Sequence, residues 1–423
     1  MSVAEVRLEL IEKIEGEAQV RYFYEEERVD FAEILFVTGR GIEKILEGRD
    51  PWDALTINPR VCGICGHAHL IATVRALEDC YTDLKLSPKA RKVRELTLAF
   101  ELLQNHFKWF YLTILPLLDL EAPRRSVLEP SRILGEMIAL LAGQYPHNSY
   151  AIPGGITCEI TPVDLHGVRQ RHRHLQKLFR RGVIDVDLEA FVRCDRIEAM
   201  LKREGDLPRA MQRILDRGWE RLGRSCDRFI VFGHNDLFVA GKSIGTRLQK
   251  HLDLRYLRES SIEGSRARRV LYREKSYETG PLARAMLLKT PLTKEAHRRY
   301  GDSLFSRILA RVCEIPRLLR YTEALIASID LSEPAWIDPG PLPEEAEGTG
   351  IVEAARGSLI HRLQIKEGKI ARYRIVTPTQ WNLGNGSREE PGVAQSALIG
   401  LHREDPAELV FKAFDVCSVC TTK

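Results

Sequence analysis

Two Cys-x-x-Cys pairs near opposite ends of the chain decide how this sequence folds. The first lies in Arg60-Val-Cys62-Gly-Ile-Cys65-Gly-His67-Ala-His69, and the second in Asp415-Val-Cys417-Ser-Val-Cys420-Thr-Thr-Lys423. If the fold brings both pairs together, four thiolates surround one point and form a site for a soft metal ion. Because almost the whole chain separates the pairs, such a site would be the last part of the fold to assemble.

The two pairs alone leave the kind of metal open. A structural zinc ion is the commonest use of paired Cys-x-x-Cys motifs, but its two halves usually lie within about 15–20 residues of each other. A disulfide framework is disfavoured, since the other cysteines occur singly, as small buried residues do in a reducing compartment. These single cysteines are Cys80, Cys158, Cys194, Cys226 and Cys313.

Length and charge exclude several classes of protein. The chain has 423 residues, 44% of them hydrophobic, which suffices for one large core or two domains. A net charge of +4 is too small to argue for a nucleic-acid partner, and we interpret the basic run at 169–181 as a solvated helix face. No apolar run approaches the ~18 residues of a membrane span, and the start lacks signal-peptide features. We therefore expect a soluble, cytoplasmic protein that reaches a membrane only through a partner.

Hydrophobic periodicity predicts a chain that is mostly helical. Alternation over residues 5–37 indicates a small sheet, and alternation over Arg362–Val376 indicates a hairpin around Glu367-Gly368. The charged, Pro- and Gly-rich segment 332–350 is predicted to be a loop. Helices are predicted from Ile42 until Gly48, after Cys65, from Ser87-Pro88, over 131–143, from Thr161-Pro162, and within 185–227 and 293–329. Cys65 then lies near a helix N-terminus, which favours a thiolate.

The residues flanking both pairs resemble the catalytic large subunit of nickel-iron hydrogenases. Further segments agree in the family's order, and the ordered set, which spans residues 6 to 423, is highly specific. These segments are Lys13-Ile-Glu15-Gly16, Arg40-Gly-Ile-Glu43, Pro153-Gly-Gly-Ile-Thr157, Glu278-Thr-Gly-Pro-Leu-Ala-Arg284, Ala355-Arg356-Gly-Ser-Leu-Ile-His361 and Thr377-Pro378-Thr379-Gln-Trp381-Asn382.

The resemblance implies a mainly α fold with a long central helical bundle and small α+β additions near the N-terminus and in the C-terminal third. Residues 1–423 would form a single large-subunit domain. Within it we expect a small sheet at 5–37, a helical core at 65–330, and a hairpin with the C-terminal metal-ligand segment at 351–423.

The resemblance also implies a centre of one nickel and one iron. Cys62 and Cys417 would bind nickel terminally, and Cys65 and Cys420 would bridge the two metals. The iron would carry cyanide and carbon monoxide ligands made by maturation proteins. His69 would point an N–H at a bridging sulfur. Thr379 would donate to a cyanide, and Pro378 belongs to the same cofactor-binding set.

The implied reaction is the heterolytic splitting of dihydrogen. Arg356 would lie over a cyanide and near the open metal position, held there by Asp415 through a charge-assisted pair. The base would be the Cys417 thiolate, relaying its proton to Glu15, or Arg356 itself. Because the chain has no spare cysteine pattern for iron–sulfur clusters, the electrons would leave through a small partner subunit that carries them.

Several positions depart from the family's pattern and mark a divergent subgroup. Glu43 and the carbonyl of Ile375 match ligands of a structural magnesium ion. However, the family's C-terminal histidine ligand is Lys423 here, and a charged lysine cannot bind a metal. Valine follows Asp415 where the family has proline. Tyr145, with His147 nearby, aligns with a histidine of the family, and a supporting acid of the family aligns near Gln104-Asn105-His106, so an amide replaces a carboxylate there.

Four functions remain to be separated. An uptake hydrogenase is the first expectation, and a dihydrogen sensor that controls a kinase and turns over slowly is the second. The quinone-site subunit of respiratory complex I shares the fold but lacks the four cysteines. A binding protein whose two ends are held together by a zinc ion would be distinguished by metal analysis. Infrared bands of metal-bound cyanide and carbon monoxide would establish the class.

We predict that Glu15→Gln blocks net oxidation of dihydrogen, because glutamine keeps the hydrogen bonds of the carboxylate but cannot pass a proton. Dye reduction should collapse. Interconversion of the nuclear-spin isomers of dihydrogen should continue, because it requires no proton to leave the pocket. Dye reduction at the wild-type rate would mean that the proton leaves by another route.

Overall fold

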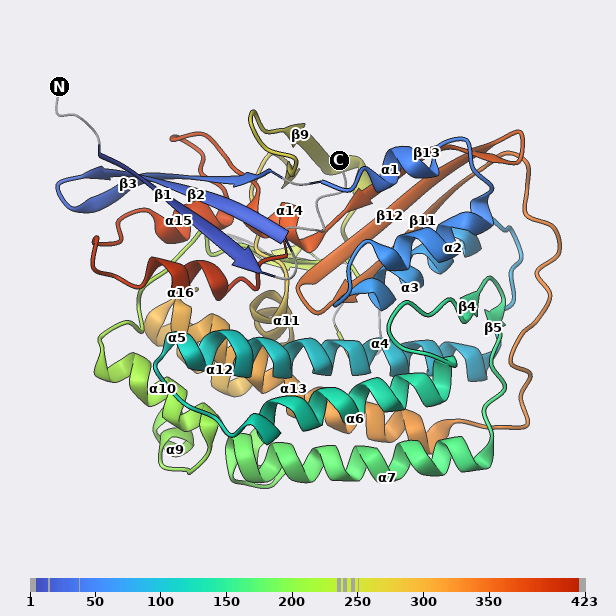
Figure 1. Cartoon of the computed structure of the whole chain (residues 1–423), viewed down its shortest axis with the longest axis horizontal. Coiled ribbons are helices and arrows are strands. Elements are labelled where there is room, and N and C mark those ends of the chain that lie inside the picture. The colour runs from blue at the N-terminus through green and yellow to red at the C-terminus, as the bar shows by residue number, and fades with distance from the viewer. Residues whose placement is uncertain are drawn as a thin grey trace.

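The computed structural model describes residues 5–13, 16–37, 39–233, 237–238, 242–244, 248–249 and 251–417. Long helices lie beneath a set of small antiparallel sheets (Figure 1). Glu15, Cys420 and Lys423 fall outside the described residues. In the part of the chain that is described, no helix is long and apolar enough to cross a membrane.

Four long helices pack against one another. They are α4 (Pro88–Trp109), α6 (Arg124–Ala142), α7 (Pro162–Leu178) and α13 (Leu304–Ser328). Helix α4 contacts α6 and α13, and α7 also contacts both. Apolar residues at helical spacing along α4, such as Phe100 and Phe107, are buried between them.

The predicted starts of α4 and α7 are confirmed, and each has a capping residue followed by proline. The Ser87 hydroxyl accepts a hydrogen bond from the Ala90 N–H at 3.3 Å, with Pro88 at the first helical position. Thr161 forms a capping box with Asp164 at the start of α7. Helix α6 begins earlier than predicted, since it continues through Pro130.

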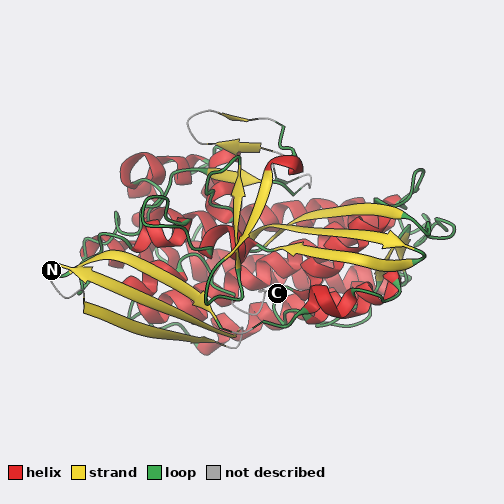
Figure 2. Cartoon of the chain, turned by 90° about the horizontal axis from the view of Figure 1, so that it is seen from above, coloured by secondary structure: helices red, strands yellow, loops and turns green. Residues whose placement is uncertain are grey.

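Two three-stranded antiparallel sheets carry most of the strand content. The first is β1 (Glu5–Lys13), β2 (Gly16–Glu25) and β3 (Arg28–Phe36), as predicted for residues 5–37. The second is β11 (Ala346–Ala354), β12 (Gly357–Lys366) and β13 (Lys369–Val376). Figure 2 shows the two sheets toward opposite ends of the helical layer. The predicted hairpin is β12–β13, and its turn residues Glu367 and Gly368 both have positive φ.

The prediction of a loop over 332–350 is wrong at its end, because β11 begins at Ala346. Gly348 and Gly350 suggested a loop, yet they mark a close approach to α3 (Gly66–Glu78). A Cβ on Gly348 would lie 2.0 Å from the Ala76 carbonyl oxygen, and one on Gly350 would lie 1.9 Å from that of Ala72. The glycines therefore let the strand pack directly on the helix that follows the first cysteine pair.

The expected helical core over 65–330 is interrupted by strands. These strands are short and pair with neighbouring segments, so each has too few residues to show the alternation of apolar and polar side chains that predicts a strand. The surrounding segments have helical periodicity, and the short strands were therefore not predicted. They are β4 (Ala151–Ile152), β5 (Gly155–Ile156), β6 (Phe229–Val231), β7 (Lys242–Ile244), β8 (Leu248–Gln249), β9 (Leu257–Ser261) and β10 (Arg268–Tyr272). Within the predicted helical range 185–227, helices end at Asp216.

The remaining helices are short. They are α1 (Ile42–Leu46), η1 (Pro51–Asp53), α2 (Ala54–Ile57), η2 (Asn58–Arg60), η3 (Phe110–Ile114), α5 (Leu115–Leu117), η4 (Phe179–Ile184), α8 (Leu188–Val192), α9 (Ile197–Leu201), α10 (Asp206–Asp216), η5 (Leu254–Tyr256), α11 (Pro281–Leu288), α12 (Pro291–Tyr300), α14 (Pro378–Leu383), α15 (Val393–Leu398) and α16 (Ala407–Lys412).

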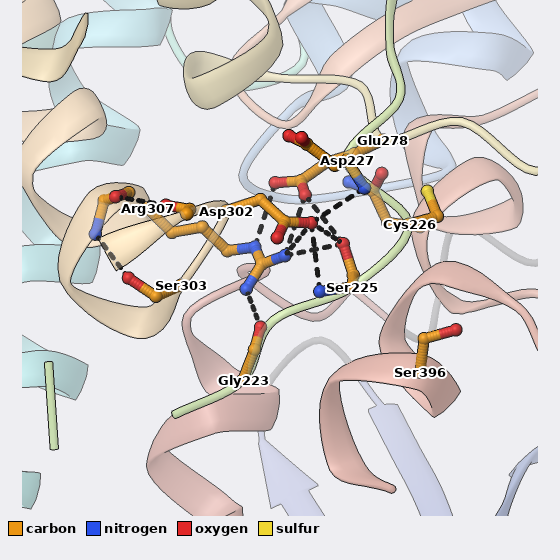
Figure 3. A network of polar contacts seen from close by, with 12 residues as sticks. Gly223, Ser225, Cys226, Asp227, Glu278, Asp302, Ser303, Arg307 and Ser396 are labelled. Atoms are coloured by element: carbon orange, nitrogen blue, oxygen red, sulfur yellow. Dashed lines mark hydrogen bonds and ion pairs between the residues drawn. The ribbon is translucent and has the colours of Figure 1, made fainter. Parts of the chain in front are cut away.

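A buried ionic network joins the start of α13 to two loops (Figure 3). The Arg307 guanidinium donates to both Glu278 oxygens, from Nε at 3.0 Å and from Nη2 at 2.9 Å. Asp302 accepts from the backbone N–H groups of Ser225 and Asp227, each at 3.0 Å. Since all three charged side chains are at most 3% exposed in this network, each one depends on its partners to remain buried.

We predict that Arg307→Gln lowers the free energy of unfolding by about 3–5 kcal/mol, because it leaves two buried carboxylates uncompensated. The matched control is Arg320→Gln on the same helix. Arg320 pairs with Glu189 in an ion pair that is nearly half exposed, so we expect a loss of about 1 kcal/mol or less. Denaturant-induced unfolding measures both, and equal losses would contradict a structural role for the buried network.

Candidate active site

The first cysteine pair is held in a tight turn at the start of α3. Cys65 is the residue that precedes the helix, and the Cys62 sulfur accepts from the backbone N–H groups of Ile64 and Cys65, each at 3.4 Å. Gly66 is required here, since a Cβ on it would lie 2.2 Å from the Pro59 carbonyl oxygen. The turn thus directs both sulfurs to one side, and the predicted position of Cys65 at a helix N-terminus is confirmed.

Cys417 meets this turn from the other end of the chain. Its sulfur lies 3.8 Å from that of Cys62. The ligand atoms of Cys62, Cys65 and Cys417 all lie within 4.8 Å of one another, and all three residues are buried. Within the described ranges, no other group of three or more His, Cys, Asp or Glu residues comes as close together. Three of the four predicted thiolates therefore converge, and Cys420 lies outside the described residues.

Arg356 approaches the sulfurs from the turn between β11 and β12. Its Nε donates to the Asp415 carbonyl oxygen at 2.8 Å, and its Nη2 donates to the Asp415 carboxylate at 3.1 Å. The ion pair expected between these two residues is thus present. Asp415 itself has a φ of +58°, so the backbone bends sharply just before Cys417.

One donor of Arg356 is left over. Its Nη1 is buried and has no hydrogen-bond partner among the described atoms. Arg356 also borders the small cavity lined by Cys65 and His69. A buried donor without an acceptor costs free energy, so this geometry suits an acceptor that the protein alone does not supply.

Buried arginines paired with carboxylates lie next to the cysteine cluster. Arg311 donates to the second Asp415 carboxylate oxygen at 2.5 Å, and Arg284 forms a two-point pair with Glu314 at 2.6 and 2.7 Å. Burial works against the charge of Arg356, yet Asp415 and the sulfurs of Cys417, Cys65 and Cys62 hold its pKa well above the ordinary value. The centre is therefore lined by a guanidinium that stays charged, which stabilises thiolates and anionic ligands.

Sequence reasoning missed Arg311 and Glu314. A usable signal was present, because Arg307, Arg311 and Glu314 recur at helical spacing on the buried face of the predicted helix 293–329. Charged residues on an apolar face are rarely buried without partners, so their spacing could have marked this helix as part of the site.

Glu101 is a second residue that sequence reasoning missed. Its carboxylate accepts from the backbone N–H groups of His67 and Ala68 at 2.9 and 3.0 Å, which lie in the first turn of α3. Burial raises its pKa to about 8. Asn105, in the segment Gln104-Asn105-His106 near which the sequence comparison placed a supporting acid, donates to the Ile64 carbonyl oxygen at 3.1 Å. An amide thus supports the cysteine turn, and a carboxyl group lies one helical turn away on α4.

The predicted cofactor-binding residues lie together. His69, Pro378 and Thr379 line the same cavity as Cys65 and Arg356. Burial lowers the pKa of His69 to about 4, although Cys62 opposes the shift, and its Nδ1 lies 3.0 Å from His361 Nε2. The Thr379 hydroxyl donates to the Cys417 carbonyl oxygen at 3.1 Å, so donation to a cyanide would require that hydroxyl to rotate.

The residues predicted to hold magnesium lie in a different environment. The Ile375 N–H donates to the Glu43 carboxylate at 2.9 Å, and the same carboxylate pairs with Arg268 and Arg374. Tyr145, which replaces a histidine of the family, donates to Gln104 at 2.7 Å. Glu15 and Lys423 lie outside the described residues.

The fold and the cysteine cluster together define a nickel-dependent hydrogenase. The sequence model described as "Nickel-dependent hydrogenase" matches residues 40–121 and 264–423. This chain belongs to that family, whose members are oxidoreductases that act on dihydrogen.

Relatives match along nearly the whole chain. It is 26% identical to the periplasmic [NiFeSe] hydrogenase large subunit of Desulfomicrobium baculatum, over 94% of this chain and 89% of that one. It is 27% identical to sulfhydrogenase 2 subunit alpha of Pyrococcus furiosus, over 98% of each. The Ni-Fe-Se hydrogenase structure from D. vulgaris Hildenborough superimposes with a TM-score of 0.83 at 23% identity, covering 99% of this chain and 100% of that one. The expected large-subunit fold, mostly helical with small sheets, is therefore confirmed.

We predict that Cys417→Ala abolishes nickel binding, because it removes a thiolate whose sulfur lies 3.8 Å from that of Cys62 in the cluster. Cys80→Ala is the matched control, since Cys80 is also buried but lies outside the cluster. Elemental analysis of both purified variants measures the effect. Retained nickel in Cys417→Ala, or zinc at full occupancy in active wild-type protein, would contradict the assignment.

Proposed function

We propose that this chain is the catalytic subunit of a hydrogenase that splits dihydrogen heterolytically at a nickel-iron centre and passes electrons to an iron–sulfur partner subunit. The observation that supports this most is the convergence of three buried sulfurs with the buried Arg356 guanidinium, one donor of which has no partner among the described residues. Soft sulfur donors fit nickel and iron. Because the ligands come from residues 62–65 and 417, we treat 1–423 as one domain.

The donor set supports a specific arrangement of ligands. Cys62 and Cys417, whose sulfurs are 3.8 Å apart, would hold nickel terminally, and Cys65 and Cys420 would bridge to iron. Arg356 Nη1, which has no hydrogen-bond partner in the described part of the chain, would donate to a cyanide on iron beside the cavity formed with Pro378 and Thr379. When bound, the metal pair supplies the Lewis acidity that polarises dihydrogen.

The chain's own residues would manage the proton. Asp415 fixes the Arg356 guanidinium through two contacts, so Arg356 acts best as a positioned cation. This favours the Cys417 sulfur as the group that accepts the proton and relays it toward Glu15. The Arg311 contact to Asp415 supports the same arrangement, because it keeps the carboxylate from rotating away.

The electrons would leave through a second protein. The five cysteines outside the two pairs occur singly in the sequence, so the chain has no ligand pattern for an iron–sulfur cluster. Several relatives are themselves described as large, alpha or beta subunits. A small subunit with clusters therefore completes the proposed enzyme, and maturation proteins would supply the cyanide and carbon monoxide.

The test uses the subunit purified with its partner. Infrared bands of metal-bound cyanide and carbon monoxide, together with dihydrogen-dependent dye reduction, are the expected result. Absence of both would overturn the proposal. The turnover rate then separates an uptake enzyme from a dihydrogen sensor that uses the same site slowly.

We predict that Arg356→Lys lowers turnover by about a hundredfold or more with both metals retained, a loss of about 2.7 kcal/mol of transition-state stabilisation. Lysine is a mobile point charge and cannot contact Asp415 and the centre with one planar fork. Unchanged infrared bands would show that the metals are intact. Near-normal turnover together with unchanged infrared bands would mean that Arg356 contributes only to packing.

A further inference from the structure

The buried carboxylate of Glu43 is surrounded by two arginines that come from separate strands. Glu43 lies on α1 and is 5% exposed. Arg268 extends to it from β10, and Arg374 extends to it from β13. The resemblance to nickel-iron hydrogenases places a magnesium ligand at Glu43, so the surroundings of this carboxylate show whether a divalent cation fits there.

Every acceptor position of the Glu43 carboxylate is in use. An ionised carboxylate offers about four lone-pair positions. Oε1 accepts from Arg268 Nη1 at 3.0 Å and from the Ile375 N–H at 2.9 Å. Oε2 accepts from Arg268 Nη2 and from Arg374 Nη1, the latter at 3.1 Å. A metal ion could bind Glu43 only by displacing at least one of these donors.

Among the described side chains that contact Glu43 or its partner Arg268, positive and negative charges are equal in number. Arg268 Nη1 also donates to Glu259 at 2.9 Å, so two guanidinium groups face two carboxylates and the four side chains sum to zero. A divalent cation would add two uncompensated charges beside Arg268, whose side chain is only 9% exposed. Such an addition is strongly unfavourable away from water.

We infer that Arg268 and Arg374 together take the place of the divalent cation at Glu43, so that this subunit needs no magnesium. The arginine pair joins α1, shortly before the first cysteine pair, to β13, which ends immediately before the cavity residues Thr377 to Thr379. The two arginines would hold these segments together through ion pairs, as a metal ion would through coordination bonds. This inference does not rest on the proposed reaction, because it concerns a different site.

The first experiment counts metals in the subunit purified with its partner and dialysed against a chelator. After the partner's iron is subtracted, we expect equal amounts of iron and nickel in this chain. We expect no bound magnesium, calcium or manganese. The melting temperature should be unaffected by chelator or by added magnesium. One extra divalent cation per chain, or a lower melting temperature after chelation, would overturn the inference. A missing nickel-iron centre would contradict the proposed function. The magnesium content and the effect of chelator on the melting temperature would still test the inference about Glu43.

The second experiment uses matched variants. Arg268→Gln should lower the melting temperature by about 5 °C or more, because it leaves the buried Glu43 and the partly exposed Glu259 with too little positive charge. Arg374→Gln changes a partly exposed side chain, so it should lower the melting temperature less than Arg268→Gln. It provides the test if Arg268→Gln does not fold. Arg362→Gln is the control, since Arg362 pairs with Arg374 in the strand register but makes none of the four contacts to Glu43. If both test variants match the control, the arginines do not fasten this site.

Discussion

The 3.8 Å approach of the Cys417 sulfur to the Cys62 sulfur is the contact on which the rest of the site depends. It closes a loop of nearly the whole chain, and closing a loop costs conformational entropy that local interactions must offset. The Asp415 side chain provides that offset, since Arg356 and Arg311 both pair with it just before Cys417. The last described residues are therefore held in place before any metal is considered.

Buried ion pairs between arginines and carboxylates occur at several places in this fold. Arg284, Arg307 and Arg311 lie at or against α13, and each pairs with a buried carboxylate. Burying one such charge without its partner would cost several kcal/mol, so each pair permits only the arrangement in which both members meet. The same logic applies at Glu43, where two arginines satisfy the carboxylate. Charge pairing thus specifies how the strands, loops and helices around the cysteines are arranged.

The predicted elements that follow from local chemistry agree with the structure. Ser87-Pro88 and Thr161-Pro162 start helices because capping and proline geometry act within one turn. Strand β11 was missed for the opposite reason. Gly348 and Gly350 have loop character in isolation, and only the close approach of α3 explains their presence in a strand. Glu101 was missed likewise, since its partners are backbone groups of another helix.

The sequence by itself determined the family and predicted the cysteines, the arginine and the aspartate of the candidate site, because those residue types in that order carry the chemistry of the site. Only the tertiary structure decided which groups surround them. It brought Arg311 and Glu101 to the cysteine cluster and enclosed Glu43 with arginines. The physical reason is that hydrogen bonds and ion pairs act over a few ångströms in space, whereas Arg268 and Glu43 are separated by 225 positions along the chain.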